Sequence, residues 1–208
     1  MHLFSLAFCV VRYPVDTFRA LQASRDRFRY YPAVLLLLLL LAVRMVYLFF
    51  LHFPLAGTGA EEINVTMEIL KLLIPLAAWS VSVFAVTSIM DGETQFREAV
   101  MATMYATVPY ILMAIPLTLL SHLFGSTDAA LFQILLTATE IWIGFLILVS
   151  VMVMNNFSLK KTVLVLILSI LFMALICAVG LLMFALASQL YQFIAGVIRE
   201  AKYALFGT

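Results

Sequence analysis

Five long apolar runs constrain this chain more than any other feature of its sequence. They lie at 33–53, 68–90, 101–124, 131–154 and 162–187. A bilayer core is crossed by about 20 apolar residues in a helix, and helices are expected because unpaired backbone polar groups cannot face lipid. Charged residues make up only 11% of the chain, against about 25% in a soluble domain. The sequence therefore predicts an all-α polytopic membrane bundle of five transmembrane helices with flanking interfacial amphipathic helices.

The apolar runs divide the chain into three parts. Residues 1–32 form a basic amphipathic segment on the cytoplasmic side, and residues 33–187 form the five-helix domain. Residues 188–208 mix apolar side chains with glutamines and charges, which predicts an interfacial C-terminal helix and tail. The connections between the runs are too short for a separate soluble domain.

Basic residues are distributed unequally between the two sides of the predicted bundle. The loops at 54–66 and 125–130 contain none. The opposite side holds eight basic residues: Arg12, Arg19, Arg25, Arg27, Arg29, Arg97, Lys160 and Lys161. Basic loops stay cytoplasmic, so we expect the N-terminus inside and the C-terminus outside, although Arg199 and Lys202 weigh against this.

The basic N-terminal segment reads as an amphipathic helix over 14–30. Pro14 suits a first helical turn, and an apolar face can form from Val15, Phe18, Leu21 and Phe28. Five arginines surround this face: Arg12, Arg19, Arg25, Arg27 and Arg29. Such a helix is expected to rest in the headgroup layer with its arginines near anionic lipid. A docking surface for a cytosolic partner is the alternative.

Two ionisable residues lie deep in predicted spans, where they are the best functional leads. Arg44 and Glu140 are about 16 and 21 Å from the cytoplasmic side at 1.5 Å per residue. We expect them to form an ion pair, with Trp79 and Trp142 packed at similar depth. The pair would either fix helix pairing or serve as a proton or substrate site. Pro109 and Pro116 in the third run predict a curved helix, or backbone exposed to a cavity.

Enzyme signatures are missing from the sequence. It contains no HExxH, GxSxG, GxxxxGK[ST] or CxxC pattern, so we expect no enzymatic activity, no cofactor and no nucleic-acid partner. The two cysteines, Cys9 and Cys177, suggest neither a structural disulfide nor a metal site. Two histidines, His52 and His122, make a poor metal site without a third ligand.

Three stretches together resemble the YIP1 family of small membrane proteins, in particular its bacterial branch. They are YPVDTF at 13–18, MDGETQFREA at 90–99 continuing to YATVPY at 105–110, and Trp142 followed by NFSLKK at 156–161. The resemblance covers roughly 13–190. It places a family-like loop and kink at Asp91, Gly92, Phe96, Tyr105 and Pro109.

The resemblance implies five helices, a cytoplasmic N-terminus and a bacterial plasma membrane. Eukaryotic relatives contact prenylated small GTPases, but the short N-terminal region here does not favour that role. The family brings no catalytic residue with it.

Two functions fit these observations. The first is a non-enzymatic adaptor or scaffold that binds other membrane proteins or organises the membrane. The second is a transporter, or an accessory subunit of a transport complex, that uses an intramembrane site at Arg44 and Glu140. The sequence identifies no specific partner or substrate, and it leaves the oligomeric state open.

Overall fold

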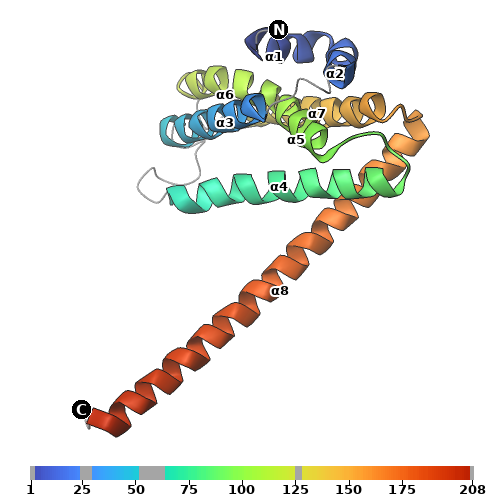
Figure 1. The fold of residues 1–208 in the computed structure, drawn as a ribbon. Coiled ribbons are helices and arrows are strands. Elements are labelled where there is room, and N and C mark those ends of the chain that lie inside the picture. The colour runs from blue at the N-terminus through green and yellow to red at the C-terminus, as the bar shows by residue number, and fades with distance from the viewer. Residues whose placement is uncertain (1–2, 24–29, 52–63, 125–127, 207–208) are drawn as a thin grey trace.

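The computed structural model describes residues 3–23, 30–51, 64–124 and 128–206, with side chains from 6 to 199. These residues form eight helices and no strand (Figure 1). The helices are α1 (Leu3–Arg12), α2 (Pro14–Ala23), α3 (Tyr31–Phe50), α4 (Val65–Ile89), α5 (Phe96–Ala106), α6 (Val108–Ser121), α7 (Ala129–Met154) and α8 (Leu159–Phe206). The predicted all-α class is confirmed.

Five helical stretches in the described residues are long and apolar enough to cross a membrane: Tyr31–Phe50, Val65–Ile89, Phe96–Ser121, Ala129–Met154 and Leu159–Arg199. They coincide with the five predicted runs, and the first four differ from them by a few residues at their ends. α3, α4, α6 and α7 run side by side, with α1 and α2 on one flank and α8 leaving on the other (Figure 1). The chain is therefore an integral membrane protein with five candidate spans.

The third span is interrupted at Thr107, which separates α5 from α6. Pro109 has no N–H to donate to the carbonyl of Tyr105, so the α-helical ladder cannot continue through this turn. The Thr107 hydroxyl caps the end of α5 by donating to the Met104 carbonyl at 2.8 Å. Pro116, by contrast, lies inside α6 without breaking it. The helix is thus interrupted beside one of the two prolines.

The N-terminal helices pack on protein. α2 begins at Pro14, as predicted, and it contacts α7. Phe18 and Leu21 are 0% and 2% exposed, respectively, and belong to the main core with side chains of α3, α5, α6 and α7. Gln22 adds a hydrogen bond from its Nε2 to the Met154 carbonyl at 3.2 Å. The apolar face expected to rest in lipid is thus partly used to hold α2 against the bundle.

A second, smaller core joins α4 to the start of α8. It contains Val83 and Val86 of α4, Val151 of α7, Phe157 and Val165. On α8 the buried residues Thr162, Val165 and Ser169 recur every three to four positions, the spacing of one helix face. No later residue of α8 is buried, up to the last described side chain, Arg199.

The helix boundary expected near residue 187 is absent, because α8 continues without a break to Phe206. Polar residues begin at Ser188 and Gln189, and this change of polarity suggested a separate interfacial helix. A change of polarity alone does not end a helix, and the segment 188–206 contains no proline that would end it.

Candidate functional site

A polar cluster around Arg44 joins three of the candidate spans. The Arg44 guanidinium, from α3, approaches the Glu68 carboxylate of α4 with Nη2 and Oε2 3.2 Å apart. Its Nη1 donates to the Tyr110 hydroxyl of α6 at 3.2 Å. Lys71 Nζ donates to the other Glu68 oxygen at 2.7 Å. One carboxylate therefore serves two cations, and the cluster carries a net positive charge.

The cluster is only partly covered by protein. The side chains of Arg44 and Glu68 are 31% and 15% exposed, whereas that of Lys71 is 71% exposed. Arg44 also lies over the ring of Tyr47, 5.8 Å from its centroid, and Tyr47 meets Tyr110 edge-on. An unpaired arginine at the centre of a bilayer costs about 2.5–3.5 kcal/mol on insertion scales. Pairing with Glu68, the hydroxyl of Tyr110 and the ring of Tyr47 offset this cost.

The structure gives Arg44 a different partner from the predicted Glu140. Arg44 lies about 9 Å from the end of α3 at Phe50, and Glu68 lies about 5 Å from the start of α4, by the rise of a helix. Glu140 lies about 16 Å from the start of α7 on the same count. Glu68 is thus closer in depth to Arg44. Glu140 is exposed on α7.

The two tryptophans expected at similar depth have different surroundings. Trp79 is half-buried and lines a small cavity between α4, α5 and α7. Trp142 is 42% exposed and lies beside Phe145, with 5.5 Å between ring centroids. Trp142 therefore contributes to the outer surface of α7, whereas Trp79 lies between helices of the bundle.

The loop after α4 begins with a Schellman motif. Asp91 adopts the left-handed conformation, with φ of 56°. The next residue, Gly92, donates its N–H back to the Thr87 carbonyl at 2.7 Å. This is the 6→1 bond that ends many helices. Glycine is usual at the left-handed position, and aspartate is one of the few other residues that tolerate it.

The turn after α7 repeats this arrangement. Asn156 has φ of 53°, and the following Phe157 donates its N–H to the Met152 carbonyl at 3.0 Å. The preceding residue, Asn155, connects the two helix ends. Its Oδ1 accepts hydrogen bonds from the N–H and the hydroxyl of Thr94, at 3.2 and 2.7 Å. We call the joined segments 91–95 and 155–157 the clasp.

Gly92 is required by the close approach inside the clasp. A Cβ atom at this position would clash with Asn155 Oδ1 and would lie 2.8 Å from the Thr87 carbonyl oxygen. Any larger residue would push Asn155 away from Thr94. Glycine in this family-like loop therefore has a structural reason.

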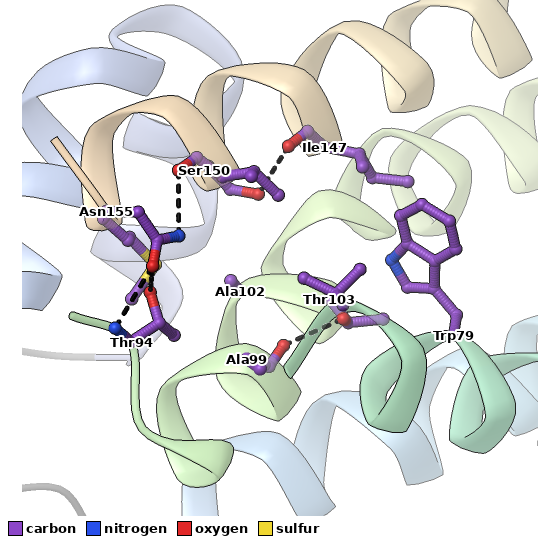
Figure 2. A pocket seen from close by; sticks show the side chains of 11 residues that line it. Trp79, Thr94, Ala99, Ala102, Thr103, Ile147, Ser150 and Asn155 are labelled. Carbon is purple, nitrogen blue, oxygen red and sulfur yellow. Dashed lines mark hydrogen bonds between the residues drawn. The ribbon is translucent and has the colours of Figure 1, made fainter. Parts of the chain in front are cut away.

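A cavity of about 20 Å³ lies beside the clasp, and Figure 2 shows Asn155 and Thr94 on one side of it and Trp79 on the other. The hydroxyls of Thr103 and Ser150 both donate to carbonyls of their own helices, at 2.8 and 2.7 Å. Space of this size holds about one water molecule. The cavity is therefore too small for a substrate.

Two larger grooves on the bundle are almost wholly apolar. One, of about 310 Å³, lies between α6 and α7 and is lined by Val11, Pro109 and Trp142 among others. The other, of about 380 Å³, lies between α3 and α6 and includes His122 at its rim. In the described part of the chain, no three His, Cys, Asp or Glu side chains lie close enough together to hold a metal ion.

The comparisons with known proteins agree with this architecture. The sequence model of the Yip1 domain matches residues 8–182, which is most of the chain. The chain belongs to the Yip1 family. Its Yip1 domain extends from α1 into α8 and includes both the Arg44 cluster and the clasp. No curated protein and no solved structure matches the chain.

Within the Yip1 domain, the remaining predicted positions that the structure describes lie on α1, α2 and α5. Phe96, the first residue of α5, meets Phe84 edge-on with ring centroids 5.5 Å apart. Tyr105 is 1% exposed and lies at the end of α5, just before the break. Arg12 lies over the ring of Tyr13 and Arg19 is 3.9 Å from Asp16. Three further predicted arginines lie outside the described residues: Arg25, Arg27 and Arg29.

Sequence reasoning missed three contributors to these sites. Glu68 was recognisable as a partner of Lys71, but its contact with Arg44 requires knowing that α3 and α4 are neighbours. Tyr110 lay inside the family-like segment without an assigned role. The sequence marked Asn155 only as one of two asparagines at the end of an apolar run, without indicating its contact with Thr94. Each contact depends on packing between residues far apart in the sequence.

A double-mutant cycle distinguishes the two carboxylates as partners of Arg44. Glu68→Leu leaves Arg44 without its carboxylate, so we expect a loss of about 1–3 kcal/mol of stability. The double variant Arg44→Met/Glu68→Leu should lose less than the sum of the single variants, giving a coupling of about 1–2 kcal/mol. Reversible unfolding in mixed detergent micelles measures these values. The control cycle with Glu140→Leu should give a coupling near zero; a larger coupling with Glu140 would contradict the assigned pair.

Gly92→Ala tests the clasp. We expect a loss of about 1–3 kcal/mol because the new methyl group forces Asn155 away from Thr94. Gly180→Ala is the matched control, since a Cβ there would meet nothing within 4 Å, and alanine favours a helix over glycine. Thermal unfolding in detergent reports both. If the two variants unfold at the same temperature, the clasp does not require glycine.

Proposed function

We propose that this Yip1 protein is a non-enzymatic adaptor or scaffold that binds other membrane proteins or organises the membrane around it. The observation that carries the proposal is the shape of α8. Its candidate span covers 41 residues, or about 62 Å of helix. The hydrocarbon core is about 30 Å thick. Much of α8 therefore extends beyond what is needed to cross the membrane.

The surface of this extension suits binding. Between Ser169 and Arg199, no residue of α8 is buried. This part of the helix exposes large apolar side chains. Among them, Leu182, Phe184, Tyr191 and Phe193 are each more than 60% exposed. Apolar surface of this extent is usual where a protein meets lipid or another protein. A helix that leaves its own bundle can reach both.

The interior of the bundle supports a binding role over a catalytic one. The polar cavity beside the clasp holds about one water molecule, and the larger grooves are lined by apolar side chains. Arg44 is engaged by Glu68 and Tyr110 within the chain. The charge of Arg44 is therefore paired within the chain. A scaffold does not need this charge to bind a substrate.

Transport, alone or as a subunit of a transport complex, is the second candidate. The observation in its favour is the presence of Arg44, Glu68, Lys71 and Glu140 in helices long enough to span a membrane. Ionisable residues at such depth often mark ion or substrate paths. A path would need water to reach Arg44 or Glu140, whereas a scaffold keeps Arg44 dry and paired.

We also propose that the clasp faces the cytoplasm, with the N-terminus inside and the C-terminus outside a bacterial plasma membrane, as the resemblance to the bacterial branch implies. The support for the orientation is the excess of basic residues before α3 and in the loops at 91–95 and 155–161 with their flanks. In this orientation the N-terminal arginines meet anionic lipid of the inner leaflet.

Purification from native membranes tests the adaptor role. The tagged full chain, extracted in mild detergent, should recover one or more membrane proteins in near-equal molar amounts, as measured by quantitative mass spectrometry. The same proteins should return the tagged chain when they carry the tag instead. Recovery of the chain alone would contradict an adaptor. Ion or solute flux into liposomes, lost in Arg44→Met or Glu140→Leu, would then favour transport.

Cysteine labelling tests the orientation. With Cys9 and Cys177 replaced by serine, a membrane-impermeant maleimide should label Thr58→Cys in intact cells. It should label Ser158→Cys, directly after the clasp, only after the membrane is opened. The reverse pattern would overturn the proposed orientation.

A further inference from the structure

Four exposed residues on α7 form a line along one face of the helix. They are Gln133, Thr137, Glu140 and Gly144, separated by four, three and four positions. That spacing places side chains on the same helix face, one turn above another. Three of the four are polar, although the rest of the exposed α7 surface is largely apolar. We call them the α7 stripe.

The α7 stripe lies on a face that other helices cover nearer the clasp. Val151, seven residues after Gly144 and hence on the same face, is buried with Val83 of α4 and Val165 of α8. α8 then diverges from α7 toward its own C-terminus (Figure 1). No residue of the stripe is buried. The face is thus covered by α4 and α8 at one end and open along the stripe.

Glu140 is the member of the stripe that is least favourable in an apolar environment. It lies about 16 Å from the start of α7 and about 21 Å from its end, so it falls near the middle of the span. In the described part of the chain Glu140 takes part in no ion pair. A carboxyl group facing lipid at this depth is unfavourable, and it gains most from a hydrogen-bond donor or a cation supplied by a neighbour.

This chain does not supply that neighbour from its own spans. The cations at membrane depth in the described helices, Arg44 and Lys71, are both bound to Glu68. If α8 of the same chain or of a second copy covered the stripe, segment 170–187 would bring no charged, amide or hydroxyl side chain. The chain thus leaves Glu140 open to a cation supplied by a different molecule.

We propose that the α7 stripe docks a transmembrane helix of another membrane protein, one that carries a lysine or arginine near mid-bilayer depth. The partner's cation would pair with Glu140, and Gln133 and Thr137 could hydrogen-bond beside it. Gly144 lets the partner's backbone approach closely. Its small size serves no contact within this chain, because a Cβ there would meet nothing within 4 Å. This deepens the adaptor role and rests on it.

The test uses a defined helix in lipid. The purified full chain is reconstituted in phosphatidylcholine vesicles with a fluorescent Leu/Ala-rich transmembrane peptide that has a single central arginine. A sister peptide with leucine at that position is the reference. Energy transfer between chain and peptide measures association. The chain should bind the arginine peptide about three- to tenfold more tightly than the leucine peptide.

The variants separate charge from shape. Glu140→Leu should abolish the preference for the arginine peptide, and Gly144→Leu should weaken its association by blocking close approach. Gly180→Leu, at a glycine of α8 with open space around it, should leave both properties unchanged. Unfolding temperatures of the three variants confirm that each is folded.

Equal association of the two peptides with the wild-type chain would overturn the proposal, and so would a preference that survives Glu140→Leu. Flux of cations that depends on Glu140, without any peptide preference, would replace the docking surface with an ion site. If the native chain still recovers a stoichiometric partner, and Gly144→Leu recovers the same amount, the stripe is not the docking surface although the adaptor role stands. Absence of any partner would count against the adaptor role itself.

Discussion

The hydrogen bonds between Asn155 and Thr94 tie together the parts of the bundle that the rest of the fold depends on. α4 and α7 end at the clasp, and α5 and α8 begin beside it. The Nδ2 of Asn155 also donates a hydrogen bond to the Val151 carbonyl at 3.0 Å. Both polar atoms of the Asn155 side chain are therefore hydrogen-bonded within the protein. A buried amide with satisfied donors and acceptors fixes geometry more strictly than apolar packing does. The ends of α4 and α7 and the starts of α5 and α8 therefore meet around one side chain and the glycine that makes room for it.

Helices leave their backbone polar groups satisfied, so lipid constrains mainly the side chains and the helix ends. The chain meets this constraint in two ways. Serine and threonine hydroxyls within the spans, such as Ser82 and Thr118, donate to carbonyls one turn back. Arg44 is neutralised by Glu68 in a neighbouring span. Glu140 departs from this pattern, and a departure of this kind at an exposed position points to function rather than to folding.

Hydropathy and turn chemistry made much of the fold predictable. Five spans, the start of α2 at Pro14 and the break before Pro109 all follow from local sequence, because apolar length and a missing N–H act within a few residues. The partner of Arg44 was not predictable, because depth along a helix does not say which helices are neighbours. Asn155 and Thr94 are 61 residues apart, and neither has a neighbour in sequence that indicates the other. Continuation of α8 past residue 187 was missed because polarity changes there while helix propensity does not.

The length of α8 also determines how the protein responds to the membrane itself. To place all 41 residues of its candidate span in a core about 30 Å thick, the helix would have to tilt by about 60°, beyond the usual limit of about 40°. A thicker bilayer is therefore expected to cover more turns of α8, and a thinner bilayer to cover fewer. The other four spans, 20 to 26 residues long, set the depth of the bundle. The number of α8 turns that emerge from the bilayer then varies with bilayer thickness, and the length of helix available outside the membrane varies with it.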